Sequence, residues 1–257
     1  AVSAKLSKYK IDMKTSKYNA DSVTFYNKIY YDKPMLGSLE EKVLADVVPE
    51  NASYPRFESY EKIYEIPDIY PDIDYKGGFS MRGADFIGSG NNEQDAYLYF
   101  KKGDTILLKV MSKHYSFSKD QIVGRNAAVV VKLGKDSLFH PGLLFKYQVK
   151  TREVNLIRNE DPESMSRSPY FNNYHMFDMD FEQLDWEIDK DEMKMGAVKG
   201  SMVKKAYFES ANYFRESRYH EIEVNDQIHP LVALRRLSKE LGSEEFSLMN
   251  YADFLKM

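Results

Sequence analysis

Cysteine is absent from this 257-residue chain, which excludes disulfides, thiol catalysis and zinc–thiolate sites. Tryptophan occurs once, at Trp186. No apolar run approaches the ~20 residues that a membrane helix needs, and no signal-peptide pattern is present. The formal net charge of −4 provides no basic field for nucleic acid. We therefore expect neither a nucleic-acid partner nor a membrane span in this segment.

Aromatic residues are abundant instead, at 14% of the chain, with 20 Tyr and 15 Phe. Such side chains favour pleated, half-buried surfaces, so this composition favours β-structure. The length is enough to bury a substantial core, in one large β domain or two smaller units.

One long run of strand-length segments, from Tyr75 to Ile157, organises the chain. Turn residues separate the segments, among them Gly134-Lys135-Asp136 and Pro141-Gly142, and the segments recur about every 8–12 residues, which is typical of an all-β sandwich, barrel or solenoid. The expected strands are Ala84–Ile87, Ala96–Phe100, Thr105–Val110, Tyr115–Ser118, Ala127–Leu133, Ser137–Phe139, Leu143–Val149 and Glu153–Ile157.

Shorter strands are expected on both sides of this run. Asn19–Ser22 is expected as a turn between two of the early ones. The flanking strands are predicted at Ala4–Tyr9, Ile11–Met13, Val23–Tyr26, Ile29–Tyr31, Met176–Met179, Leu184–Ile188 and Met193–Val198. Residues 49–74 contain four prolines and many apolar residues, which predicts an irregular but ordered connection packed along the β body.

The pattern changes near residue 203, so we divide the chain into a β-rich body, residues 1–202, and a helical segment, residues 203–257. Helical spacing is fair over Val203–Tyr219. A clearer helix opens at Pro230 and stops at Gly242, and a third is expected after Ser247. The apolar stripe of the clearer helix is predicted to be Leu231, Leu234, Leu237 and Leu241.

These patterns predict a mainly β fold with a small helical C-terminal part. A β-solenoid-like arrangement or stacked antiparallel sheets come first, because strands continue without a helical crossover. A β-sandwich of the jelly-roll type is the alternative. Strict sequence repeats are not visible, which weakens the solenoid interpretation.

His175, Asp178 and Asp180 form the one candidate metal or acid–base cluster. Strand alternation would place the two carboxylates on one face, with His175 just before it. A solvated strand face is the simpler interpretation, and we favour it. No catalytic residue, cofactor site or metal site is therefore assigned.

Trp186, flanked by two acids, is a candidate ligand residue. It could stack on a sugar, although a lone tryptophan in a strand is usually part of the core. The nearby acidic residues, from Asp185 to Glu192, lack the glycine and the terminal glutamate of an EF-hand loop, and Asp72 and Asp74 form a smaller acidic turn.

Several phrases of the sequence occur together in a known group of proteins. They are Pro49–Tyr60, Ile73–Ala84, His140-Pro141-Gly142, Arg152–Arg158, Ser168–Phe171 and Phe208–Tyr219. Through them, most of the chain resembles an internal region of very long, uncharacterised β-rich proteins of bacterial cell envelopes. The resemblance implies a large, repetitive, exported architecture, periplasmic or surface-exposed, and identifies the C-terminal helices as the truncated start of a winged-helix-like insert. No catalytic or binding residue carries over from it.

Two functional hypotheses follow. The first is a non-enzymatic structural or scaffold segment, excised at residue 1 from a longer parent chain, that acts through β-stacking and surface contacts. Its partners would be the remainder of that chain, other envelope proteins or further copies of itself. The second is a carbohydrate-binding or carbohydrate-processing β domain, suggested by the tyrosines, Trp186 and the carboxylates of residues 178–192. Exposure of Trp186 beside Asp178 or Asp180 would favour the second hypothesis.

Overall fold

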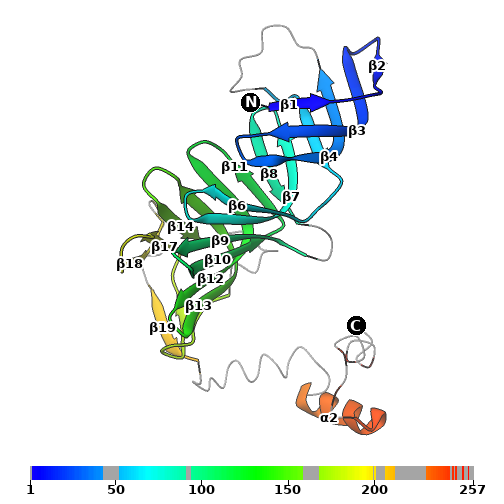
Figure 1. Ribbon diagram of the computed structural model, residues 1–257. Helices are drawn as coiled ribbons and strands as arrows, with labels where there is room; N and C mark the ends of the chain where they lie inside the picture. Colours follow the sequence, from blue (N-terminus) through cyan, green and yellow to red (C-terminus); the bar gives the residue numbers. More distant parts are fainter. Residues whose placement is uncertain are drawn as a thin grey trace. The chain divides into compact units, whose positions relative to one another are not determined.

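The structure, a computed structural model, divides the chain into a β unit, Ala1–Ala211, and a second unit, Asn212–Met257. The described residues contain 19 strands and helix α2 (Pro230–Leu241), which confirms the mainly β class (Figure 1). The residues that the structure describes are 2–42, 52–90, 94–158, 168–198, 200, 206–211, 230–243, 245, 247, 251 and 254.

Every strand pairing in the β unit is antiparallel. The strands are β1 (Val2–Lys5), β2 (Lys10–Asp12), β3 (Lys17–Asn27), β4 (Tyr31–Lys42), β5 (Arg56–Ser59), β6 (Tyr64–Tyr70), β7 (Ile73–Arg82), β8 (Asp85–Ser89), β9 (Ala96–Lys102), β10 (Thr105–Ser112), β11 (His114–Phe117), β12 (Gln121–Leu133), β13 (Asp136–Gln148), β14 (Glu153–Ile157), β15 (Tyr170–Asn172), β16 (Phe177–Asp180), β17 (Gln183–Glu187), β18 (Met193–Gly196) and β19 (Tyr207–Ser210).

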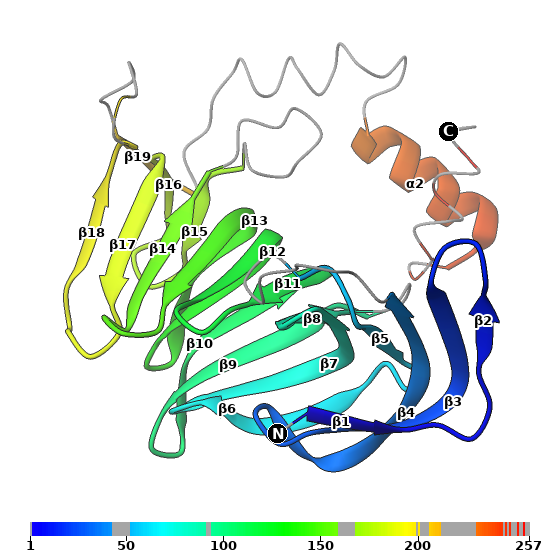
Figure 2. The same cartoon turned by 90° about the horizontal axis from the view of Figure 1, so that it is seen from above.

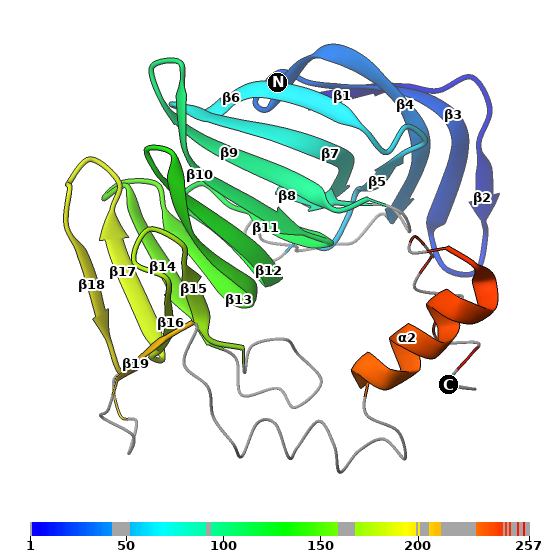
Figure 3. The same ribbon diagram turned by 90° about the horizontal axis from the view of Figure 1, so that it is seen from below.

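Long strands that change partners midway give this sheet its architecture. The first half of β7 pairs with β9 and its second half with β8, and β12 divides in the same way between β11 and β10. The pairings β7–β8–β11–β12–β10–β9–β7 therefore close a six-stranded antiparallel barrel, to which the other strands add on either side (Figure 2). Strands β1 and β2 lie at one end of the β unit, and β18 and β19 lie at the other (Figure 3).

Residues in the left-handed backbone region mark the bends of the strands. Ser22 (φ 57°) lies where the β3–β4 register shifts, and Asn126 (φ 48°) lies where the β12–β13 register shifts. Asp68 (φ 48°) has the same position in β6. A bulge bends its strand and increases the local twist, so these residues let long strands turn from one set of neighbours to the next.

The core of the β unit is a column of aromatic rings. Phe25 stacks on Phe57 with ring centroids 4.2 Å apart, and Phe86 stacks on Phe79 at 4.5 Å and on Phe117 at 4.4 Å. All five rings are buried. Offset stacks of this kind add roughly 0.5–1.5 kcal/mol per pair beyond the area they bury.

Tyr75 joins this column and requires glycine beside it. Its ring contacts Phe117 edge to face, with centroids 5.3 Å apart, and its hydroxyl donates to the Gly78 carbonyl at 2.7 Å. A Cβ atom on Gly88 would lie 2.6 Å from the Tyr75 hydroxyl oxygen. The close approach of β8 to this ring is therefore possible only without a side chain.

We expect Gly88→Ala to lower the free energy of unfolding by about 1–3 kcal/mol, because the added methyl group overpacks the Tyr75 ring. Gly196→Ala is the matched control, since no heavy atom lies within 4 Å of its Cβ position. It should change the stability by less than about 0.5 kcal/mol. Urea unfolding measures both variants, and equal effects would contradict the packing argument.

His140 is buried in β13 as a neutral ring, 1% exposed. Its Nδ1 accepts a hydrogen bond from the Gly142 amide (3.1 Å), and its Nε2 lies 2.9 Å from the Ser168 carbonyl oxygen, to which it donates. Protonation would place a second proton on Nδ1, opposite an amide that also donates. Burial lowers the pKa of His140 to about 4.

The low His140 pKa predicts a stability loss in mild acid. The unfolded chain takes up the proton near pH 6.5, whereas the folded protein takes it up only near pH 4, so the free energy of unfolding should fall across this window by roughly 1–3 kcal/mol. We expect His140→Gln to flatten this decline. Urea unfolding at several pH values measures it, and parallel pH profiles for the variant and the native protein would refute the assignment.

Three sequence predictions of chain breaks are wrong. Asn19–Ser22 was expected to be a turn but continues β3, where Ser22 supplies the bulge. Pro141-Gly142 lies inside β13, where the register skips from His140 to Leu143, so that proline interrupts no ladder hydrogen bond. Residues 49–74 were expected to be irregular, yet those described include β5 and β6, with Phe57 and Ile66 buried.

The helical predictions are correct only in part. Val203–Tyr219 was expected to be a helix, but Tyr207–Ser210 forms β19 and pairs with β16, while residues 203–205 and 212–219 lie outside the described part. Helix α2 is confirmed. Its buried residues are Ala233 and Leu237, whereas Leu231 and Leu241 of the predicted stripe are exposed.

The third predicted helix lies mostly outside the described residues, although Tyr251 and Phe254 are helical. Within the described part of the chain, no helix combines the length and apolarity needed to cross a membrane.

Candidate functional site

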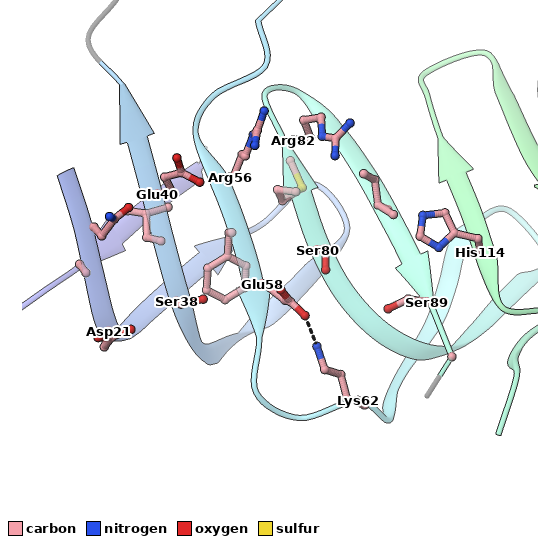
Figure 4. Close-up of a pocket in the computed structure, with 17 residues that line it drawn as sticks. Asp21, Ser38, Glu40, Arg56, Glu58, Lys62, Ser80, Arg82, Ser89 and His114 are labelled. Atoms are coloured by element: carbon pink, nitrogen blue, oxygen red, sulfur yellow. Dashed lines mark hydrogen bonds and ion pairs between the residues drawn. The ribbon is translucent and has the colours of Figure 1, made fainter. Parts of the chain in front are cut away.

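A hollow of about 920 Å³ opens on the outer face of strands β3, β4, β5, β7, β8 and β11 (Figure 4). Alternation along each strand creates it. In β5, Phe57 points into the aromatic core while Arg56 and Glu58 on either side line the hollow, and in β7 Met81 is buried between Ser80 and Arg82. Outward-facing polar residues therefore line the hollow together with apolar residues that include Leu39, Phe57 and Met81.

Two carboxylates of the hollow have lysine partners. Glu40 accepts a hydrogen bond from Lys17 at 2.8 Å, which lowers the pKa of the carboxyl group. Glu58 lies 2.6 Å from Lys62 (Figure 4). These acids are thus locally neutralised within the wall of the hollow.

Two arginines of the hollow, Arg56 and Arg82, form no ion pair with the carboxylates that the structure describes. Arg56 and Arg82 are directly opposite each other in the β5–β7 register. The Arg56 Nε atom donates to the Ser53 carbonyl at 3.2 Å, and its guanidinium lies over the Tyr54 ring. Among the described residues, no carboxylate lies within ion-pair distance of either arginine. Like charges directly opposite each other across a strand pair are destabilising. Each arginine also has an acid opposite it on its other neighbouring strand, Glu40 for Arg56 and Asp85 for Arg82.

The predicted cluster of His175, Asp178 and Asp180 is only partly assembled. Asp178 and Asp180 share one face of β16, with Met179 buried on the other. Asp180 is paired with Arg158, and the exposed His175 ring stacks on Phe177 with centroids 5.9 Å apart. In the part of the chain that the structure describes, no group of three or more His, Asp or Glu residues is placed to hold a metal ion.

Trp186 is 6% exposed and lies in β17. Its indole nitrogen donates to the Lys190 carbonyl at 2.8 Å. The ring is therefore packed into the core, with its one polar atom satisfied, and it offers no open face to a sugar.

The two acidic turns of the sequence are connected by one arginine. Arg152 Nε lies 2.8 Å from Asp189 Oδ2, and Arg152 Nη2 lies 3.2 Å from Asp72 Oδ2. Asp74 of the second turn is held by Lys101 at 2.8 Å. Arg152, in the turn between β13 and β14, therefore connects this turn to Asp72 in the β6–β7 turn and to Asp189 after β17. The sequence alone does not place Arg152 between them.

We expect Arg152→Gln to lower the free energy of unfolding by about 1 kcal/mol at low salt, because one half-exposed guanidinium holds two carboxylates. Lys150→Gln is the matched control, since the exposed Lys150 ammonium contacts Asp120 alone at 2.9 Å. The control should have almost no effect. Urea unfolding at low and high salt separates the two variants, and an equal loss in both would contradict this role of Arg152.

Comparisons with known proteins identify no relative: no family model, no curated protein and no solved structure matches the chain. The function is therefore inferred from the geometry of the β unit itself.

Proposed function

We propose that the chain is a non-enzymatic structural segment whose β unit joins further β-structure end to end. The observation that supports this proposal is that the two ends of the β unit (Figure 1) carry opposite net charge, residues 2–14 being basic and residues 176–196 acidic. An open edge carries unpaired backbone donors and acceptors and is a template for another strand.

The N-terminal end is basic. Every residue of β1 and β2 is exposed, and both strands pair with β3 alone among the described strands. Residues 2–14 contain four lysines against one aspartate, a net charge of +3. The lysines are Lys5, Lys8, Lys10 and Lys14.

The C-terminal end is acidic. Residues 176–196 contain eight acidic residues against two lysines, a net charge of −6, and Arg152 and Arg158 pair with two of the acids. The edge strand β18 is mostly exposed and pairs only with β17 within the described residues. This end therefore keeps an excess of negative charge beside its open edge.

A second copy of this segment is the partner that these charges favour, because each chain carries a basic end and an acidic end. Joining the basic edge of one copy to the acidic edge of the next is a heterologous contact, which extends as a line when it does not close into a ring. Opposite potentials would steer the encounter, and main-chain hydrogen bonds would hold the pair. On the resemblance alone, we place this stacked-sheet role in an envelope protein of a longer parent chain.

Paired charge reversals test the end-to-end contact. We expect the native chain to self-associate at low salt in sedimentation velocity and to dissociate near 0.5 M salt, where screening shortens to a few Å. Lys5→Glu/Lys10→Glu and Asp191→Lys/Glu192→Lys should each abolish self-association. An equimolar mixture of the two variants should restore pairing, because each then carries the complement of the other.

Lys132→Glu/Lys135→Glu is the matched control, because both lysines are exposed on the β12–β13 hairpin and lie outside residues 2–14 and 176–196. It should leave self-association unchanged. Lysines on an edge strand can also prevent pairing with other chains, which is the opposite of the role proposed for Lys5 and Lys10. A native chain that stays monomeric at every salt concentration, or a mixture that does not pair, would overturn the proposal.

Carbohydrate binding is the second candidate function. Its support is not Trp186, which is buried, but the hollow lined by Arg56, Arg82 and several serines.

A further inference from the structure

We propose that the hollow binds a phosphate or sulfate ester carried on a sugar, with Arg56 and Arg82 holding the anionic group. Guanidinium groups are suited to tetrahedral oxyanions because each presents two parallel N–H donors to two oxygens. The two arginines lie in directly paired positions on adjacent strands, where Cβ atoms are about 4.5–5.5 Å apart. One anion can therefore contact both.

The unfavourable pairing of two like charges supports this assignment. Within the described residues, neither guanidinium has an ion-pair partner, and Figure 4 shows both side chains at the same end of the hollow. Their repulsion is of the order of 1 kcal/mol in water, and an anion placed between them would convert it into attraction.

The acids of the hollow do not cancel this site. Glu40, directly opposite Arg56, is held by Lys17, and Glu58 is held by Lys62. Asp21 also lines the hollow, but it lies on β3, three strand spacings or roughly 14 Å from β7. Asp85, directly opposite Arg82 in the β7–β8 register, does not line the hollow. Arg56 and Arg82 therefore face the hollow without an ion-paired carboxylate among the described residues.

The remainder of the hollow favours a hydroxyl-rich ligand. Ser38, Ser80 and Ser89 line it, with His114 at the β11 side (Figure 4). The hydroxyls of Ser38 and Ser80 have no hydrogen-bond partner among the described residues, so they are available to a sugar. A hollow of about 920 Å³ has room for a short oligosaccharide beyond the anionic group.

Titration calorimetry with four probes tests the proposal: inorganic phosphate, inorganic sulfate, glucose-6-phosphate and glucose. We expect both inorganic anions to bind, glucose-6-phosphate to bind more tightly than phosphate, and glucose not to bind. Arg82→Gln should weaken glucose-6-phosphate binding about tenfold to a hundredfold, the effect of losing one charge-assisted contact. Arg56→Gln/Arg82→Gln should abolish it.

Arg125→Gln is the matched control, because Arg125 is exposed on β12 outside the hollow, and it should bind as the native protein does. Mass-spectrometric mapping of phenylglyoxal modification gives a readout without variants: glucose-6-phosphate should protect Arg56 and Arg82 but not Arg125. Absence of anion binding, an equal loss in Arg125→Gln or uniform protection would overturn the site. Equal affinity for phosphate and glucose-6-phosphate would overturn the assignment of a sugar ligand.

Discussion

The column of buried aromatic rings is the interaction on which the rest of the β unit depends. Rings from β3, β5, β7, β8 and β11 stack or meet edge to face along it, so strands far apart in the sequence share one core. Strand alternation then determines the opposite face. Because Phe57 points inward, Arg56 and Glu58 must point outward, and the polar hollow follows from the packing of the core.

Much of the central strand run was predictable because its side chains alternate. The segments Ala96–Phe100, Thr105–Val110 and Glu153–Ile157 lie within or coincide with observed strands. The errors occurred where a strand bends. A strand was expected to start at Ala127, yet β12 begins at Gln121. The polar residue Asn126, just before Ala127, has the composition of a turn in the sequence. In the structure its left-handed backbone forms a bulge within the strand instead.

The hollow could not be predicted in the same way, because it is defined by strand register. Its lining residues come from positions between Asn19 and His114, and Arg56 meets Arg82 only through the β5–β7 pairing. The outward positions of Arg56 and Glu58 were a usable signal, but the prolines of residues 49–74 masked the two strands there. The acids of residues 178–192 were visible in the sequence, whereas their partners Arg152 and Arg158 depend on the fold.

The six-stranded barrel also explains where new contacts can form. Strands β8 and β11 connect β7 to β12 on one side of the barrel, and β9 and β10 connect them on the other. The six-stranded ring itself therefore has no open edge. Among the described strands, β1, β2 and β18 at the two ends of the β unit each pair on one side only, as β6 does beside the barrel. The net charges of the two ends are opposite. A closed centre gives the outer face a fixed shape on which a ligand could be recognised, while the open ends give the sheet a direction in which it could grow.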